Sequence, residues 1–407
     1  MAASTDPLVY IRTPVAIRER CQQIFDLGLK GGLDHFDLNL SRLEGVASIV
    51  KSETLRNYPD LDVPYHSRWR HFNAGDLDRN HVVNEILTPL PPRERCRSKL
   101  ELAIISVLLD AGAGDIWGFV DHNSGTRHKR SEGLAVASLY SYGDGVFGPE
   151  PFVATGERLR AITPLELGAA FQVSKDNTLL ALEGWCALLN SLGGLIATRP
   201  QDFKGSPGRL GGILETLLGL AQGKAIKAID ILSVVLATFS SIWPGRISIA
   251  GQNIGDVWRH SKVTGPGETN NLVPFHKLSQ WLTYSLFEPL EELGIQIVGI
   301  DQLTGLAEYR NGGLFIDGGV LTLKDPSAAS IEHSPSSEII VEWRALTVIL
   351  LDRTAALLRQ MLGKTDTELP LAKVLQGGTW SVGRTLATGR RRGGGPPLQI
   401  QSDGTVF

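Results

Sequence analysis

Lys277 and Glu308 are the two residues whose types and spacing most favour chemistry in this chain. Pro274 suits the first position of a helix, where its missing N–H costs nothing, so Lys277 falls in the first turn. Its positive charge then faces the positive end of the helix dipole, which disfavours it. Asp301 can cap a second, short helix with Glu308 at its far end. A lysine and a carboxylate on neighbouring helices can cleave a glycosidic bond, although the spacing alone favours two solvated helix charges.

A glycine-rich stretch, Leu108–Phe119, could wall the pocket of a polar ligand. Asp110 ends a predicted buried helix, and Asp115 lies beside Trp117 in the loop. Two acids and an indole among small residues can contact a ligand closely, because backbone approaches freely at glycine. The structural alternative is a helix-end loop in which Asp115 is an N-cap. Asp110, Asp115 and Trp117 are therefore candidate substrate contacts.

The segment Val63–Asn73 concentrates histidines, arginines and aromatic residues. Arg68 and Arg70 could grip a phosphate or a carboxylate. His66 and His71 lack the spacing of metal ligands on a helix, and no HExxH motif accompanies them, so we expect no metal site. The structural alternative is that these side chains satisfy loop carbonyls. His66, Arg68 and Arg70 are candidate substrate-binding residues.

Charged residues late in the chain complete the candidates. Glu338 and Glu342 share one face of a predicted helix beside Arg344, and pairing on the helix surface is the default explanation. The C-terminal sequence PLQIQSDGTVF ends in an apolar residue, which favours docking of the chain end, and Asp403 could then reach a site. Glu342, Arg344 and Asp403 join the candidate substrate-binding residues, together with His276.

The elements that must position these residues are mainly α-helices. Apolar residues recur at three- and four-residue spacing along most of the chain. This periodicity predicts helices over Val15–Leu29, Leu40–Arg56, Glu94–Asp110, Thr163–Phe171, Asn177–Leu192, Gly208–Gln222, Ile226–Ile242, Pro274–Leu293 and Ile339–Leu362. Short strands are expected over Gly313–Leu323 and Pro397–Phe407, and Tyr58–Pro92 has the composition of a long ordered loop. We expect an N-terminal section (residues 1–94), a helical core (95–362) and a C-terminal arm (363–407).

Composition narrows the class of protein. Of the 407 residues, 42% are hydrophobic and 20% charged, which is enough for a substantial core. A net charge of −3 does not suit neutralisation of a nucleic-acid backbone, so no nucleic-acid partner is expected. Three separated cysteines argue against a disulfide framework and favour a reducing compartment. No signal peptide or membrane-spanning stretch is evident, so we expect a soluble, cytoplasmic protein.

Three long segments resemble one known family. PYHSRWRHF at 64–72, VPFHKLSQWLTYSLFEPL at 273–290 and the terminal QSDGTVF are similar to segments of the fungal and bacterial uracil-catabolism family. The resemblance covers nearly the whole chain. It implies a role in pyrimidine degradation, with a ring-opened uracil derivative such as ribosylurea, or its phosphate, as the small-molecule substrate.

A remoter resemblance, over residues 95–353, is to the queuosine-nucleotide N-glycosylase (queuosine salvage) family, whose helical fold is like that of the helix-hairpin-helix DNA glycosylases. VPFHKLSQ at 273–280 is similar to its PFYKRAQ segment, LTGLAEYR at 303–310 to its LT-FADYR segment, and IIVEWRAL at 339–346 to its EIRA helix. The lysine and aspartate of that family's catalytic pair correspond to Lys277 and Glu308. The arginines of DYR and EIRA correspond to Arg310 and Arg344. Glu308 is one methylene longer than that aspartate, and the changed surroundings argue against a large deazapurine substrate.

Together the resemblances imply an N-ribosyl hydrolase. Glu308 would stabilise the positive charge at the anomeric carbon and activate water, and Lys277 would orient Glu308 or assist the leaving group. Arg310 would join the arginines that hold a phosphate. No metal or organic cofactor is implied. Two other classes stay open: a non-catalytic ligand-binding partner of another enzyme in the pathway, and a nucleic-acid-binding relative of the DNA glycosylases.

Overall fold

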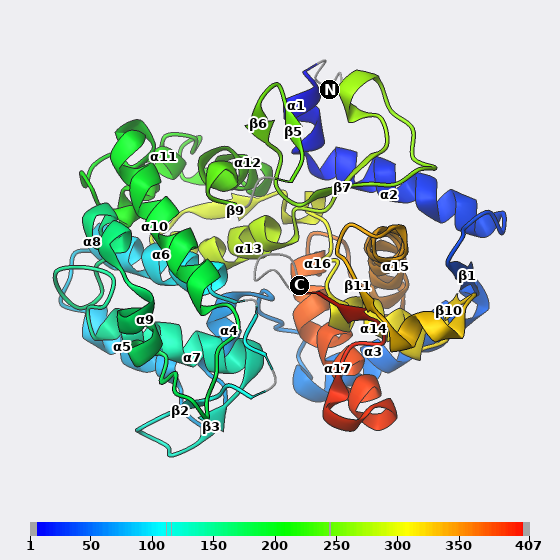
Figure 1. Ribbon diagram of the computed structural model, residues 1–407, viewed down its shortest axis with the longest axis horizontal. Coiled ribbons are helices and arrows are strands. Elements are labelled where there is room, and N and C mark those ends of the chain that lie inside the picture. Colours follow the sequence, from blue (N-terminus) through cyan, green and yellow to red (C-terminus); the bar gives the residue numbers. More distant parts are fainter. Residues whose placement is uncertain (1–5, 111, 115, 244–245, 402–407) are drawn as a thin grey trace. The chain divides into compact units, whose positions relative to one another are not determined.

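The computed structural model describes residues 6–110, 112–114, 116–243 and 246–401. The chain forms two compact units, and it passes between them several times. Among the described residues, the first unit contains residues 6–66, 246–280 and 299–401, and the second contains residues 67–243 and 281–298. The expected mainly α-helical class is confirmed (Figure 1). The likeness of its core to DNA glycosylases, and the divisions at residues 94 and 362, stay predictions.

Helices α2, α3 and α15 form the core of the first unit, where α2 and α3 both pack against α15. The 25-residue α15 is buried on all sides along Ile339–Leu351, which explains the nearly continuous apolar sequence of that stretch. The helices of this unit are α1 (Pro7–Ile11), α2 (Pro14–Leu29), α3 (Leu43–Asn57), the start of α13 (Lys277–Glu292), α14 (Tyr309–Asp317), α15 (Glu338–Leu362), α16 (Leu371–Val374) and α17 (Trp380–Arg390). Its strands are β1 (Phe36–Leu38), β5 (Ser248–Ile249), β6 (Gln252–Asn253), β7 (Val257–Arg259), β8 (Leu272–Pro274), β10 (Leu321–Leu323), β11 (Glu332–His333) and β12 (Gln399–Ile400).

Helix α6 is central to the second unit, where it packs against α7, α4 and α11. From Leu100 to Leu108 every residue of α6 is buried, as its apolar sequence predicts. The helices of this unit are α4 (Arg68–Phe72), α5 (Arg79–Leu87), α6 (Pro92–Leu108), α7 (Arg130–Gly143), α8 (Gly156–Ala161), α9 (Pro164–Ala170), α10 (Leu182–Thr198), α11 (Ile213–Leu218), α12 (Ala228–Phe239) and the remainder of α13. Its strands are β2 (Phe119–Val120), β3 (Arg127–His128), β4 (Ala225–Lys227) and β9 (Gln296–Val298).

The strands pair two by two within the described part of the chain. Strands β1 and β10, β2 and β3, β5 and β6, and β7 and β8 are antiparallel, whereas β4 and β9, and β11 and β12, are parallel. The β7–β8 pair matters most for the candidate residues. It places Val257 opposite Pro274, and it therefore brings the residue before β7 to the start of α13.

The start of α13 differs from the sequence-based expectation. Pro274 ends β8 instead of beginning a helix, so that prediction is wrong. Its backbone is drawn into the pairing with β7, and the chain then turns at His276, whose φ of 48° is left-handed. Such a conformation is uncommon for a residue with a side chain and is held by its surroundings. Lys277 becomes the first residue of α13.

Helix α14 also corrects the sequence analysis. It begins at Tyr309 and continues to Asp317, so the strand expected from Gly313 is wrong except for Leu321–Leu323. Gly312 and Gly313 lie inside the helix. A Cβ added to Gly312 would lie 2.7 Å from the side chain of Trp343, so glycine serves close packing there.

The expected long loop at Tyr58–Pro92 is wrong in part, because it contains α4 and α5. The side chain of Asp78 accepts the N–H of His81 and caps α5. Val83 and Leu87, four residues apart, are the buried apolar face of this short helix. Two apolar positions give too weak a period to separate a nine-residue helix from a loop.

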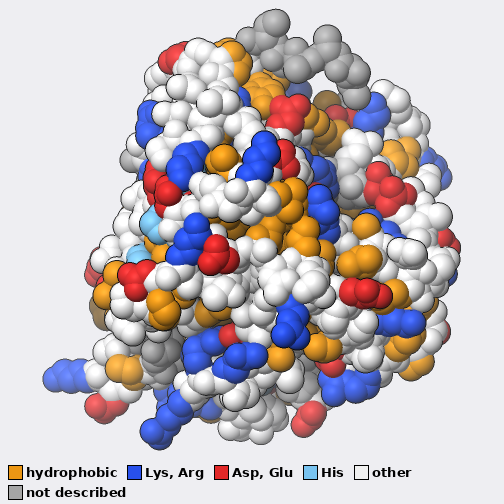
Figure 2. All heavy atoms as spheres, turned by 90° about the vertical axis from the view of Figure 1, so that its right-hand side faces the viewer, with side chains coloured by type: hydrophobic (Ala, Val, Ile, Leu, Met, Phe, Trp, Pro, Cys, Tyr) orange, Lys and Arg blue, Asp and Glu red, His pale blue; other side chains and the backbone are white. Residues whose placement is uncertain are grey.

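The described surface carries both signs of charge. On the face shown in Figure 2, lysine and arginine side chains are interspersed with aspartate and glutamate side chains. Among the helices of the described residues, none has both the length and the apolar character needed to cross a membrane.

Candidate active site

An acid from a distant segment holds the beginning of α13. The Asp256 carboxylate accepts the N–H of Lys277 at 3.0 Å, and its backbone carbonyl accepts the N–H of Phe275 at 2.9 Å. The residues just before the helix, Phe275 and His276, have no side chain of the usual capping type. Asp256 therefore satisfies an N–H at the helix start that has no partner within the helix.

Arg344 fixes that acid in place. Its two terminal nitrogens donate to the two oxygens of Asp256 at 2.7 and 2.8 Å, and its guanidinium lies 4.1 Å from the centre of the Phe275 ring. Trp258 Nε1 also donates to Asp256 at 2.6 Å. Burial works to raise the pKa of Asp256, but the charge and hydrogen bonds of Arg344 outweigh it and hold that pKa well below the ordinary value. Arg344, a candidate substrate-binding residue, is thus committed to Asp256.

His276 is likewise engaged inside the first unit. Its Nε2 lies 3.0 Å from the carbonyl oxygen of Ile11, which makes this nitrogen the donor, and its side chain is buried. Burial lowers the pKa of His276 below the ordinary histidine value. This candidate substrate-binding residue secures the turn between β8 and α13.

Glu308 is the N-cap of α14, not the far end of a helix as the sequence analysis expects. Its Oε2 accepts the N–H of Arg310 at 2.8 Å and its Oε1 accepts the N–H of Asn311 at 2.6 Å. The expectation fails because Asp301 lies inside a 3-10 turn, Ile300–Gln302, that ends at Gln302, and non-helical chain follows it up to Glu308. The carboxylate therefore sits where a helix favours negative charge, with both oxygens oriented by backbone.

Burial and neighbouring charges act in opposite directions on the pKa of Glu308. Glu308 is 8% exposed, and burial raises its pKa above the ordinary glutamate value. The two backbone N–H groups and the charge of Lys277 oppose that rise. Lys277 is itself 8% exposed. A carboxyl group with a raised pKa beside a specific cation is a feature of many functional sites.

Two further predicted residues, Arg310 and His66, both lie against the ring of Trp380. The Arg310 guanidinium lies 5.0 Å from the centre of the Trp380 ring, and the His66 and Trp380 rings are 6.1 Å apart. His66 Nδ1 contacts Gln376 Oε1 at 3.1 Å. The pKa of His66 is lowered to about 4, chiefly by burial; the Gln376 contact opposes this shift and the charge of Lys277 adds to it. We call Lys277, Glu308, Arg310, His66 and Trp380 the Glu308 cluster.

Other candidates belong to the second unit. Arg68 is fully buried and forms an ion pair with Asp110, and it also donates to Ser106 Oγ at 2.7 Å and Ser131 Oγ at 3.1 Å. Burial lowers the pKa of Arg68, whereas the Asp110 charge raises it. Arg68 and Asp110, which were both expected to contact substrate, thus neutralise each other's charge. Removing either partner of such a buried pair would leave an uncompensated charge, so the pair has a structural explanation.

The remaining candidates are dispersed. Trp117 is fully buried and donates its Nε1–H to the carbonyl of Phe171, so it is a core residue instead of a pocket wall. Arg70 pairs with Glu288 in the second unit. Asp115 and Asp403 lie outside the described residues. Within the described residues, no group of three or more His, Cys, Asp or Glu side chains could hold a metal ion.

Glu342 is a buried structural acid in the first unit, so the expected surface pairing is wrong. Its two oxygens accept the N–H groups of Asp34 and His35 at 3.1 Å each, and His260 Nε2 lies 3.6 Å away. Helical spacing cannot distinguish a solvated face from one covered by another segment. Here the backbone after α2 covers it.

Sequence reasoning missed Asp256 and Trp380. A usable signal for Asp256 was the absence of any capping residue before α13, which indicates that the cap comes from elsewhere in the chain. For Trp380 there was no local signal, because its part depends on packing of α17 beside α14. That packing is close: a Cβ added to Gly383 would collide with the carbonyl of Arg310.

Comparison with known proteins places the whole chain. Residues 10–407 match the model of the family described as "Protein of unknown function (DUF1688)". The chain is 38% identical to Protein urg3 of Schizosaccharomyces pombe, covering 99% of this chain and 100% of that protein. It is 36% identical to Uracil catabolism protein 4 of Lachancea kluyveri, covering 99% of each chain. With matches of this length and identity, the chain belongs to the DUF1688 family.

Proposed function

We propose that this protein is an N-ribosyl hydrolase of uracil catabolism, which cleaves the N-glycosidic bond of ribosylurea or its 5′-phosphate. The full-length likeness to a protein named for uracil catabolism supports the pathway. The observation that carries the chemistry is Glu308: a buried carboxyl group held by two backbone N–H groups, with the charge of Lys277 acting on it.

The reaction replaces one bond to the anomeric carbon by another. As the C1′–N bond breaks, positive charge develops on the ribose ring, and the ionised Glu308 stabilises it. Glu308 then takes a proton from the water whose oxygen bonds to C1′. The departing urea nitrogen takes a proton from the Lys277 ammonium. The products are urea and ribose or ribose 5-phosphate, and the two side chains return to their starting states by exchanging protons with solvent.

The supporting residues in this proposal hold the pair in position. Each oxygen of Glu308 accepts one backbone N–H, so each keeps a lone-pair site for water or for the ring charge. Asp256 fixes the N–H of Lys277, and Arg344 fixes Asp256. Preorganised charge of this kind is worth about 3–4 kcal/mol of barrier per group removed. Arg344 is a positioning residue in this scheme, and Arg310 is the cation of the cluster that we assign to the substrate phosphate.

The decisive experiment is turnover by the purified full-length protein. Ribosylurea and its 5′-phosphate are incubated separately with protein, and released urea and free reducing sugar are measured. We expect Glu308→Gln to lower kcat by roughly a hundredfold or more while the ligand still binds. Glu308→Asp keeps the charge and should lose less. Asp325→Asn, which alters an exposed capping acid elsewhere in the first unit, is the matched control and should leave kcat unchanged.

Three outcomes would contradict the proposal. Equal turnover by wild type and Glu308→Gln would remove Glu308 from the mechanism. Binding of ribosylurea phosphate without release of urea would instead support a ligand-binding partner of another enzyme. Salt-sensitive binding of duplex DNA would support the nucleic-acid class, because such binding depends on counterion release.

A further inference from the structure

Arg310 differs from the other buried arginines of the described residues. The others donate side-chain hydrogen bonds to oxygen atoms of the protein; they are Arg20, Arg68, Arg79, Arg97 and Arg344. Arg310 is 6% exposed, and its guanidinium forms neither an ion pair nor a hydrogen bond with any described residue. A guanidinium has several N–H donors, and burying them without acceptors is costly. Arg310 is therefore a nearly buried cation that lacks an anion.

The side-chain nitrogens of Arg310 nevertheless remain accessible to solvent. They have no hydrogen-bond partner, and yet none of them is among the solvent-inaccessible polar atoms without a partner in the described part of the chain. The guanidinium lies 5.0 Å from the centre of the Trp380 ring and 5.1 Å from that of the Tyr309 ring. Aromatic rings contact a guanidinium through its face and leave the N–H groups at its edge for other partners. An acceptor that arrives from solvent can therefore meet these N–H groups.

The backbone fixes Arg310 beside Glu308. The Arg310 N–H donates to Glu308 Oε2 at 2.8 Å, and the Arg310 carbonyl packs so closely on α17 that a Cβ added to Gly383 would lie 2.3 Å from it. The charge of Arg310 also lowers the pKa of Glu308, against the larger opposite effect of burial. A ligand anion at Arg310 would therefore lie next to the carboxyl group that the proposed reaction uses.

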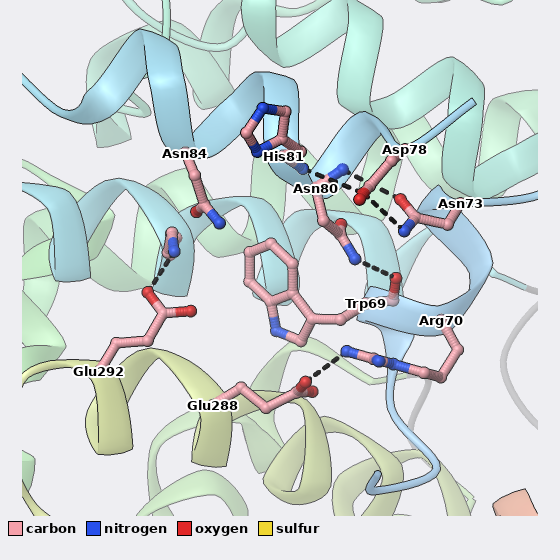
Figure 3. A pocket seen from close by; sticks show the side chains of 10 residues that line it. Trp69, Arg70, Asn73, Asp78, Asn80, His81, Asn84, Glu288 and Glu292 are labelled. Atoms are coloured by element: carbon pink, nitrogen blue, oxygen red, sulfur yellow. Dashed lines mark hydrogen bonds and ion pairs between the residues drawn. The ribbon is translucent and has the colours of Figure 1, made fainter. Parts of the chain in front are cut away.

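Arg70, which the sequence suggested for phosphate binding, is by contrast already neutralised. It lines a polar cavity of about 320 Å³ in the second unit, where it pairs with Glu288 while Lys99 pairs with Glu292 (Figure 3). An anion entering that cavity would have to displace a carboxylate from its cation. Arg310 needs no such exchange, so it is the better candidate for an anionic ligand.

We propose that Arg310 binds the phosphate group of the substrate, so that the protein acts on ribosylurea 5′-phosphate in preference to ribosylurea. Charge-assisted hydrogen bonds from arginine to phosphate supply both an anion and acceptors, which Arg310 lacks within the protein. Ribosylurea itself carries no charged group, so of the two substrates only its phosphate completes the site. This choice of substrate rests on the proposed hydrolase function, whereas the anion-binding site does not.

The site is tested by titration calorimetry of the full-length protein with D-ribose 5-phosphate and with inorganic phosphate, and with D-ribose and acetate as comparison ligands. We expect the two phosphates to bind. Arg310→Met should weaken their binding by about tenfold or more, because it keeps an apolar contact with Trp380 but has neither charge nor donors. Arg310→Lys keeps the charge and should lose less.

Arg353→Met is the matched control. Arg353 also lies against an aromatic ring, 4.4 Å from the centre of Phe25, but it is exposed and outside the Glu308 cluster, so its loss should leave phosphate binding unchanged. Urea unfolding in phosphate-free buffer shows whether the variants are folded. Arg310→Met should be at least as stable as the wild type there, because it removes a desolvated charge that has no partner.

Phosphate binding that is weakened in Arg310→Met and kept in Arg353→Met supports the site. The inference is overturned if neither phosphate binds the wild type, if Arg310→Met binds them as tightly as the wild type does, or if D-ribose or acetate binds as tightly as D-ribose 5-phosphate.

Turnover separates this inference from the proposed function. We expect kcat/KM for ribosylurea 5′-phosphate to exceed that for ribosylurea by about tenfold or more, and Arg310→Met to remove this preference. Equal kcat/KM for the two substrates, unchanged in Arg310→Met, would keep the hydrolase function and overturn the role of Arg310. Phosphate binding at Arg310 without release of urea from either compound would support the anion-binding site and remove the hydrolase function.

Discussion

Replacing Asp256 by asparagine should cost the first unit about 3–5 kcal/mol of unfolding free energy, the cost typical of breaking a buried ion pair. The Arg344 side chain is 1% exposed and that of Asp256 is 14% exposed, so neither charge is solvated when its partner is lost. The change keeps the shape of residue 256 but turns one acceptor oxygen into a donor that faces Arg344. It also weakens the acceptor for the N–H of Lys277.

The control is a pair with similar contacts and different exposure. Arg18 also donates to both oxygens of Asp352, at 2.9 and 3.2 Å, but these side chains are 32% and 26% exposed. Asp352→Asn should therefore cost only about 0–1 kcal/mol. Urea unfolding followed by tryptophan fluorescence measures both variants. Equal losses in the two would refute the reasoning that burial sets the cost.

The pH dependence gives the same prediction a second readout. The folded-state pKa of Asp256 is depressed, so its contribution is complete above the unfolded value of about 3.9 and declines as pH falls below it. The stability difference between wild type and Asp256→Asn should accordingly be constant from neutral pH to about pH 5 and shrink below about pH 4. A difference that grows on acidification would contradict the assigned ion pair.

Three other predictions concern neighbouring residues. If the proposed hydrolase activity holds, Lys277→Met should move the acid limb of the kcat/KM profile to higher pH, because the lysine charge lowers the raised pKa of Glu308; an unmoved limb would exclude that coupling. Gly312→Ala should lower the free energy of unfolding, measured in urea, by about 1–3 kcal/mol, because the added Cβ meets the packed indole of Trp343. Gly194→Ala, whose Cβ would meet open space, should raise it by about 0.4–1 kcal/mol. His66 should titrate with a pKa of about 4 when followed by NMR, and a midpoint near the ordinary histidine value would mean that it is solvated.

The local sequence pattern was sufficient to predict the long helices but not to place all of their ends. Helix α2 begins one residue before its expected start and α15 ends at the expected residue, because long apolar periods and capping residues are encoded locally. The starts of α13 and α14 were misplaced. The start of α13 depends on the pairing of β8 with β7, which begins at Val257. The start of α14 depends on Glu308, which caps this helix although the sequence predicted it at the end of one.

The sequence alone determined the helical class, and its resemblances singled out Lys277 and Glu308. It could do so because helix periodicity is local and because an unusual string such as VPFHKLSQ can be compared directly with the segments of a known family. Only the tertiary structure showed which candidates are engaged by distant parts of the chain. Arg344, Arg68 and Asp110 have the right chemistry, but each is already paired with a charge from a distant segment. Partners remote in sequence leave no periodic signal, so the division between positioning residues and candidate catalytic residues is a property of the fold.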